Sequence, residues 1–307
     1  MAVFPVQAPA VSHASDSTSK FIPAIWAGKL VEKLYKSTVF GEIANTDYEG
    51  EISSHGDKVI IRTVPTLTIT DYVKGAGLTY ENPDSPAVEL LIDKGKYFAF
   101  NCYDIDTYQS DLNLMDSWAS DGAEQMKIAI DGDVLGSVYA DAAAANAGAT
   151  AGVISGDINL GTGGAPVSIT AANVLDVLVD YGTVLDEQNV PESNRWVVLP
   201  AWMCAMIKKS DLKDASLAGD GTSILRNGRL GMIDRFTVYH SNNLDVSAGN
   251  TNVMFGHKKA ITFASQITEM ENIPNPNDFG KLVRSLNVYG FKTIDPNALG
   301  HSVVTRG

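Results

Sequence analysis

Two runs of β-forming residues, separated by a long turn-rich segment, constrain the fold of this chain more than any other feature. The runs read DKVIIRTVPTLTIT and AVELLIDKGKYFAFNCY, and the segment between them, DYVKGAGLTYENPDSP, is dense in Gly, Pro, Asp and Asn. The pattern predicts a long β-hairpin over residues 50–103, and Pro65 indicates that part of it is an exposed edge. Because a two-stranded ribbon is marginally stable alone in water, we expect residues 65–86 to contact a neighbouring subunit.

The residues before this hairpin predict an arm followed by a helix. Residues 1–20 are rich in Ala, Ser, Pro and Val and carry almost no charge. This composition fits a frayed terminus and an arm that orders against a neighbouring subunit equally well. From Phe21 to Phe40, apolar residues follow at helical spacing, with Pro23 near the start and Gly41 as the expected stop.

The rest of the chain mixes helices and strands. Residues 111–146 form the longest helical candidate, in which Gly122, Gly132 and Gly136 lower the helicity by roughly 1 kcal/mol each relative to Ala. Small residues at these positions allow either close packing of another element or bending. An α/β unit follows over residues 165–265, and further strands continue from there. The fold class is therefore α+β, with no sequence repeat and no clean linker.

The composition favours a soluble protein, or a shell that encloses nucleic acid, over a protein that coats nucleic acid. The chain has 307 residues, of which 45% are apolar, and its net charge is −13. The apolar fraction is typical of globular proteins, and an acidic surface repels the phosphates of DNA. We find neither a secretory signal nor an apolar run long enough for a membrane span, and we expect no membrane association.

No motif indicates a catalytic site, a cofactor or a metal. GTGGAP at 161–166 lacks the lysine of a phosphate-binding loop, and the five histidines show no metal-ligand spacing, so we interpret them as surface or hydrogen-bonded core residues. Cys102 and Cys204 lie far apart in the sequence. We expect them to be buried thiols, with a disulfide as the alternative.

Two pairs of carboxylates are the remaining candidates for chemistry, Asp104 with Asp106 and Asp131 with Asp133. They lack the ligand density of a calcium loop, so we interpret them as parts of solvated acidic faces. A hydrolase that uses Asp104 or Asp106 is one alternative function, although no base and nucleophile accompany them. Alanine at both positions, followed by activity screening, would test it.

The densest arginine cluster of this acidic chain is RNGRLGMIDRF, which contains Arg226, Arg229 and Arg235. Three arginines among glycines and an aspartate favour ion pairs between subunits over nucleic-acid binding.

Several segments, taken in order, resemble the major capsid proteins of tailed bacteriophages. The stretch FIPAIWAGKLVEKLYKSTVFGEIANTDYEGEI resembles the start of such proteins. The resemblance continues through GDKVIIRTVP, through ITAANVLDVL and LDEQNVPESNRWVVLP, with Ile169 in place of a leucine, and into YGFKTIDPNAL. It covers most of residues 20–300. The first and last twenty or so residues and the 147–166 loop do not take part in it.

The resemblance implies the HK97-like capsid fold, an α+β fold with an N-terminal arm, an extended β-hairpin called the E-loop, a peripheral domain built on a long spine helix, and an axial domain. The last segment of the chain is expected to return to the peripheral domain beside the spine helix. The expected boundaries are 1–45 for the arm, 46–104 for the E-loop and flanking strands, 105–150 for the peripheral domain with the spine helix, 151–265 for the axial domain and 266–307 for the returning strands.

The function that the resemblance implies is structural. Hexamers and pentamers of the chain would close into an icosahedral shell around double-stranded DNA, without sequence-specific binding, and the protein would belong to the virion after assembly in the host cytoplasm. A portal protein is the implied partner, and scaffolding and decoration proteins are left open. Some relatives cross-link their subunits through a lysine and an asparagine, and Lys74 near the hairpin tip is the lysine candidate. The rival function is an encapsulin-type shell, which shares the fold and encloses a protein cargo.

Contacts between subunits are therefore the sites that we expect. Trp26 is either an anchor in such a contact or packs on the spine helix of its own subunit. Lys29, Lys33 and Lys36 are expected to face the shell interior or to pair with carboxylates of a neighbour, because a shell of this net charge must keep its DNA side from being strongly acidic. The candidate contact residues are Phe21, Trp26, Lys74, Tyr80, Arg226, Arg229 and Arg235.

Overall fold

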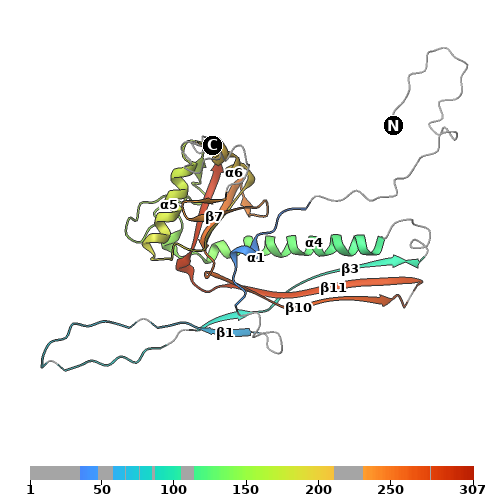
Figure 1. Ribbon diagram of the computed structural model, residues 1–307, viewed down its shortest axis with the longest axis horizontal. Coiled ribbons are helices and arrows are strands. Elements are labelled where there is room, and N and C mark those ends of the chain that lie inside the picture. Colours follow the sequence, from blue (N-terminus) through green and yellow to red (C-terminus); the bar gives the residue numbers. More distant parts are fainter. Residues whose placement is uncertain are drawn as a thin grey trace, which may run out of the picture.

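The computed structural model describes residues 35–47, 58–65, 67–75, 77–84, 87–104, 114–210, 231–276 and 278–307. The strands among them form a two-stranded ribbon, a three-stranded sheet and a seven-stranded sheet. Figure 1 shows a long helix running along the three-stranded sheet, with the seven-stranded sheet at one end of this helix and the ribbon projecting away from the body. The α+β class expected from the sequence is confirmed.

The ribbon is a hairpin whose strands pair only at the base. Strand β1 (Lys58–Arg62) pairs antiparallel with β2 (Ala87–Leu91), in a register that sets Lys58 opposite Leu91 and Arg62 opposite Ala87. Among the described residues between these strands, none belongs to a strand. Pro65 has no N–H to donate to a ladder, and the turn residues that follow do not favour pairing. The paired part is therefore much shorter than the expected hairpin over 50–103.

The second β-forming run is divided between two sheets. Strand β2 ends at Leu91, and β3 (Lys94–Tyr103) pairs antiparallel with β11 (Gly280–Thr293) in the three-stranded sheet. The expectation that the whole run pairs with the first run is therefore wrong. The chain changes partners after Ile92. This residue belongs to a small apolar cluster at the base of the ribbon, which consists of Ile61, Leu90, Ile92 and Ala264.

The three-stranded sheet and the long helix form the peripheral domain. Strand β10 (Ile261–Pro274) pairs antiparallel with one edge of β11, and β3 pairs with the other edge. Helix α4 (Leu114–Leu135) packs along β3. A Cβ atom at Gly122 of α4 would lie 2.9 Å from the ring of Phe98 on β3, so a glycine there lets the helix approach the sheet closely.

Helix α4 ends earlier than the sequence pattern predicts. The expected helix extends to residue 146, whereas α4 stops at Leu135, directly before Gly136. Two short 3₁₀ helices follow, at Val138–Asp141 and Ala144–Asn146. Glycine is a poor helix former, and the alanine-rich segment beyond it is tied down by long-range contacts instead. Asn146, for example, is buried and donates from Nδ2 to the carbonyl oxygens of Asn297 and Leu299.

The seven-stranded sheet forms the axial domain. Its strand order is β4, β12, β9, β5, β7 and β6, with β8 paired to β9. The β4–β12 and β5–β7 pairs are parallel, and the other pairs are antiparallel. Helix α5 (Val174–Glu187) contacts β12 and helix α6 (Ala201–Lys209). The strands span Val167–Ile169 (β4), Arg195–Leu199 (β5), Met232–Ile233 (β6), Phe236–His240 (β7), Val246–Ser247 (β8), Asn250–His257 (β9) and Leu299–Arg306 (β12).

The end of the chain differs from the expected arrangement. Strands β10 and β11 lie in the peripheral domain, as expected for a return to the long helix, but β12 lies in the axial sheet between β4 and β9. The expectation that all of 266–307 returns to the peripheral domain is therefore wrong for Leu299–Arg306. The reason is burial, because Leu299, Val303 and Val304 are all buried, and a strand that is apolar on both faces belongs inside a covered sheet.

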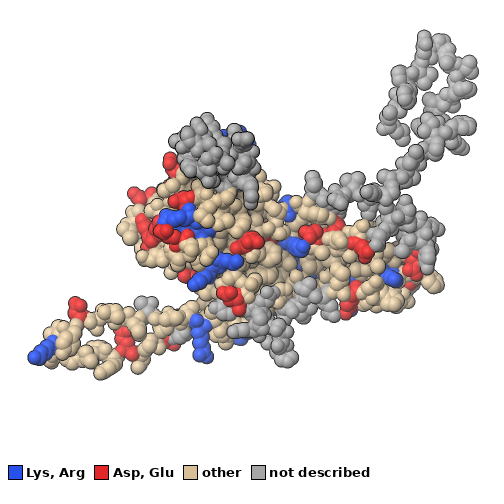
Figure 2. All heavy atoms as spheres, viewed as in Figure 1, with Lys and Arg blue, Asp and Glu red and all other residues tan. Residues whose placement is uncertain are grey.

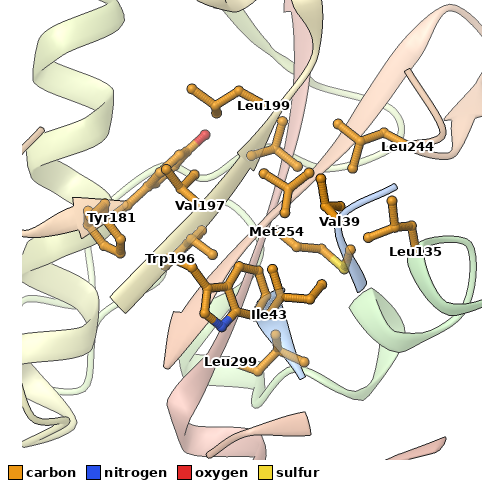
Figure 3. Packing of buried hydrophobic residues seen from close by; sticks show 14 of the residues in the cluster. Val39, Ile43, Leu135, Tyr181, Trp196, Val197, Leu199, Leu244, Met254 and Leu299 are labelled. Carbon is orange, nitrogen blue, oxygen red and sulfur yellow. The ribbon is translucent and has the colours of Figure 1, made fainter. Parts of the chain in front are cut away.

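One hydrophobic core joins the axial domain to α4 and to the N-terminal segment. Trp196, Val197 and Leu199 of β5 lie in the same cluster as Leu135 of α4 and Ile43 (Figure 3). Because the two domains share this core, the position of the axial domain depends on residues of the peripheral domain.

The N-terminal residues 35–45, which we call the strap, cross this core. The sequence predicts a helix up to Gly41, but residues 35–39 are not helical, and a single turn, α1 (Phe40–Ile43), contains Gly41. The prediction is wrong for these residues because the N–H groups of Val39 and Phe40 donate to the Asp131 carboxylate of α4. The helix predicted before Tyr35 lies outside the described residues.

Candidate functional site

The ribbon, which we define as residues 58–91, presents large apolar side chains to solvent beyond its paired base. Val64 is 94% exposed and Ile69 is 91% exposed, whereas side chains of this kind are normally buried in monomeric proteins. A narrow ribbon that projects from the body has no core of its own to bury them (Figure 1). The exposed apolar side chains of this part are Val64, Leu67, Ile69, Tyr72, Val73, Leu78 and Tyr80.

The base of the ribbon is fixed to the peripheral domain, so the projecting part has a defined origin. A side chain at Gly290 of β11 would collide with the carbonyl oxygen of Leu91, which shows how closely β2 crosses the sheet. Further out, the backbone N–H of Thr68 donates to Glu81 Oε2 across the ribbon at 3.1 Å. This hydrogen bond lowers the pKa of Glu81, and it holds the two sides of the ribbon together.

Two of the candidate contact residues lie on the ribbon. Lys74 is exposed in the turn at the tip, where the positive φ of Gly75, +89°, favours a residue without a side chain. Tyr80 is 85% exposed on the returning side. The structure thus places both residues where a second chain can reach them. Lys74 stays the lysine candidate for a cross-link, and its role as a contact residue stays a prediction.

Arg235 is engaged within its own chain. Its guanidinium pairs with Asp186 at 2.9 Å and with Glu192 at 2.9 Å, and the buried Arg195 holds the other oxygen of Asp186 at 2.7 Å. Burial raises the pKa of Asp186, but the two guanidinium groups outweigh it and hold that pKa below its usual value. These ion pairs lie within one subunit, so a role of Arg235 between subunits stays a prediction. Phe21, Trp26, Arg226 and Arg229 lie outside the described residues.

The interpretation of Asp131 and Asp133 as a solvated acidic face is wrong. Asp131 is fully buried, and Asp133 accepts hydrogen bonds from Tyr289 Oη at 2.8 Å and Lys94 Nζ at 3.2 Å. Burial and this hydrogen bond raise the pKa of Tyr289. The helix pattern misses both roles. In the structure both carboxylates lie in the last turns of α4, where the helix dipole disfavours negative charge.

The other candidates for chemistry that the structure describes are buried or half-buried residues. Asp104 is half-buried, and Asp106 lies outside the described residues. Cys102 and Cys204 are both buried and are not joined by a disulfide, as expected from the sequence. Burial raises the pKa of Cys204 to about 11, which makes this thiol a poor nucleophile. His257 accepts from the backbone N–H of Lys259 and is a hydrogen-bonded core residue.

Within the described part of the chain, no group of three or more His, Cys, Asp or Glu side chains is placed to hold a metal ion. Likewise, none of the helices described is both long and apolar enough to cross a membrane. The exposed apolar side chains of the ribbon call for a functional explanation.

Comparisons with known proteins agree with an assembly role. The sequence matches a family described as phage capsid protein over residues 88–300, and a search of curated proteins finds no match. Among solved structures, that of Mycobacterium phage Che8 is similar with a TM-score of 0.77, 28% sequence identity, and coverage of 92% of this chain and 97% of that chain. The capsid of the Cyanophage P-SCSP1u gives a TM-score of 0.72 at 14% identity, with 99% of both chains covered. The mature capsid of bacteriophage PhiM1 gives 0.70 at 13% identity, also with 99% of both covered.

The fold of these structures is the HK97-like fold that the sequence resemblance implies, and the long spine helix of that fold is α4. The prediction of a structural protein that is not an enzyme is confirmed by the family match. Because this match spans more than half of its 307 residues, the chain belongs to the phage capsid protein family and is a major capsid protein that forms the icosahedral shell of a virion.

Proposed function

We propose that copies of this chain assemble as hexamers and pentamers, held together in part by the ribbon, into a shell that encloses double-stranded DNA. The observation that carries the proposal is the row of exposed apolar side chains on an otherwise unsupported ribbon. Burying one such side chain fully contributes about 1.5–3 kcal/mol. Several of them along one ribbon therefore supply a substantial driving force for a contact between copies. The net stability of that contact is this driving force minus the cost of association.

The contact is expected to be heterologous, with the ribbon of one copy lying on a different surface of the next. A projecting segment that reaches over a neighbour in this way generates a ring when the rotation closes. Rings of six and of five copies would supply the curvature of a closed shell.

The enclosed DNA is expected to be held without sequence-specific contacts. The chain carries a net charge of −13, and on the face shown in Figure 2 lysine and arginine side chains are scattered among acidic ones. A protein that reads DNA usually presents a continuous basic patch instead. Lys36 is exposed and has no carboxylate partner among the described residues, so it is available to face DNA or a neighbour's carboxylate. Lys29 and Lys33 lie outside these residues.

A portal protein, through which DNA enters the shell, is the proposed partner by family resemblance. Scaffolding and decoration proteins are further candidates that the same purification can detect.

The experiment is to purify particles from infected or expressing cells and to determine their structure by electron cryomicroscopy, together with their content after nuclease treatment. We expect pentamers and hexamers, a ribbon from each copy on its neighbour, and nuclease-protected DNA in particles from infection. Particles filled with a protein cargo would favour the encapsulin-type alternative for the content. Ribbons that project into solvent in the assembled shell would contradict the proposed contact.

A further inference from the structure

A single buried carboxylate connects three parts of this molecule. Asp131 of α4 is 0% exposed. Its Oδ1 accepts from the backbone N–H groups of Val39 at 2.8 Å and Phe40 at 2.9 Å, and its Oδ2 accepts from Asn243 Nδ2 at 2.7 Å. Val39 and Phe40 belong to the strap, and Asn243 lies in the axial domain directly after β7. The carboxylate thus holds the strap and the axial domain to the spine helix.

The surroundings of Asp131 make these hydrogen bonds necessary. A carboxylate that leaves water without partners costs several kcal/mol, and none of the ion pairs among the described residues involves Asp131. The charge also lies near the C-terminal end of α4, where the helix dipole disfavours it. The three donors must therefore be in place whenever the core around Asp131 is closed. Because two come from the strap and one from the axial domain, these two parts are coupled through one side chain.

In the sequence, the strap lies between the N-terminal arm and the ribbon. At its N-terminal end it follows the arm, and at its C-terminal end it leads towards the ribbon. Beyond the Asp131 contacts, Ser37 Oγ donates to the carbonyl oxygen of His240, and Asn45 exchanges backbone hydrogen bonds with Ile261 and Phe263 of β10. A strap fixed at these points sets where the arm joins the body, relative to both domains.

We propose that Asp131 is a positioning residue that latches the strap, and with it the arm, to the junction of the peripheral and axial domains, and that this latch is required for assembly beyond its contribution to folding. The assembly half of this inference rests on the proposed function of the chain as a self-assembling subunit. The latch itself does not, because it is a property of the single chain.

The first test measures the latch in the unassembled chain by hydrogen–deuterium exchange. In Asp131→Ala, the amides of Val39 and Phe40 lose their acceptor, and we expect their exchange to accelerate at least about tenfold while Val253 in β9 stays protected. Asp131→Asn is the conservative variant. Its side-chain oxygen still accepts from the strap, and Asn243 can rotate its amide to present an oxygen to the new NH₂ group, so protection should largely return.

The second test measures assembly of the same variants by sedimentation and electron microscopy. We expect the particle yield to fall strongly in Asp131→Ala and to recover in Asp131→Asn. Unchanged exchange at Val39 and Phe40 in Asp131→Ala would overturn the latch. Faster exchange there with a normal particle yield would overturn its role in assembly. If Asp131→Ala does not fold, Asn243→Ala is used in its place. This variant removes only the axial donor, and Val39 and Phe40 keep their acceptor, so we expect a smaller increase in their exchange and a lower particle yield. A normal particle yield in Asn243→Ala would overturn the role of the axial contact in assembly. Failure of the proposed function would appear separately, as wild-type chains that form no shells.

Discussion

His301 lies half-buried on β12, where its ring packs against Tyr139 and its Nε2 lies 3.0 Å from Asn252 Oδ1. Since Asn252 Nδ2 donates to Asp245, its oxygen faces the ring, and the Nε2 of His301 must be the donor. A second proton on the ring would place a positive charge at this half-buried position, where less water is available to solvate it. Burial therefore lowers the pKa of His301 from 6.5 to about 4.

This pKa predicts a pH dependence of stability. Between pH 6.5 and 4 the unfolded chain binds a proton at His301 that the folded chain excludes, so the free energy of unfolding falls as the pH falls, by at most about 1.4 kcal/mol per pH unit. His301→Gln keeps an N–H donor for Asn252 and removes the titration. Denaturant unfolding at several pH values should give a flatter profile for this variant than for wild type. The exposed His240→Gln is the matched control, and a His301→Gln profile parallel to wild type would contradict the prediction.

At the scale of single residues, the sequence predicts the kind of role that a residue has better than it predicts the residues that it contacts. The two cysteines and His257 are core residues, as expected, because an isolated Cys or His without a ligand pattern usually has that role. The burial of Asp131 could not be predicted, since its partner Val39 lies 92 residues away in the sequence. From the local sequence pattern, a carboxylate is expected to be solvated. Its burial depends on segments that are distant in the sequence and pack against it in the folded chain.

Helix α4 contains two glycines that have different surroundings. A Cβ atom at Gly122 would lie 2.9 Å from the ring of Phe98, whereas nothing lies within 4 Å of a Cβ atom at Gly132. In Gly132→Ala, only the higher helix propensity of alanine counts, and we expect a gain of about 1 kcal/mol in the free energy of unfolding. In Gly122→Ala, the overpacking cost of about 1–3 kcal/mol should outweigh that gain.

Thermal or denaturant unfolding of the two variants checks this prediction, with each variant serving as the control for the other. Opposite signs are expected. A Gly122→Ala variant that is stabilised as much as Gly132→Ala would mean that the sheet tolerates a larger distance from the helix.

At the scale of elements, the sequence predicts which segments are helical or extended, but not where they change partners. From the sequence, the glycines of α4 allow either close packing or bending. The short distance to the ring of Phe98 shows that Gly122 serves close packing. The second β-forming run is interrupted after Ile92 by the polar stretch DKGK. This interruption does not by itself show that the run divides there between two sheets. The division depends on the cluster that contains Leu90 and Ile92, because its other buried members, Ile61 and Ala264, come from distant segments.

At the scale of the whole molecule, the ribbon is foreseeable because it needs only local information. Two β-forming runs around a turn-rich loop, with Pro65 inside the first run, predict a hairpin without a core of its own. The placement of β12 in the axial sheet is not foreseeable in this way. It depends on parallel pairing with β4 and antiparallel pairing with β9, two strands from distant parts of the chain.

The ribbon also carries the prediction that separates assembly from folding most clearly. Ile69 and Tyr80 are 91% and 85% exposed, so in the single chain a charge at either position meets water. Ile69→Asp with Tyr80→Asp should therefore change the free energy of unfolding by no more than about 0.5 kcal/mol. In a contact between copies, two buried and unpaired carboxylates would each cost several kcal/mol, and shells should fail to form. Thr70→Asp, next to Ile69 in the exposed part of the ribbon, adds one charge without removing an apolar side chain and should impair assembly less.

Circular dichroism during denaturation measures the free energy of unfolding of these variants, and sedimentation measures their particle yield. A doubly substituted chain that forms shells at the wild-type yield would show that this part of the ribbon makes no contact, and a chain that loses stability before assembly would show that the ribbon packs on its own subunit.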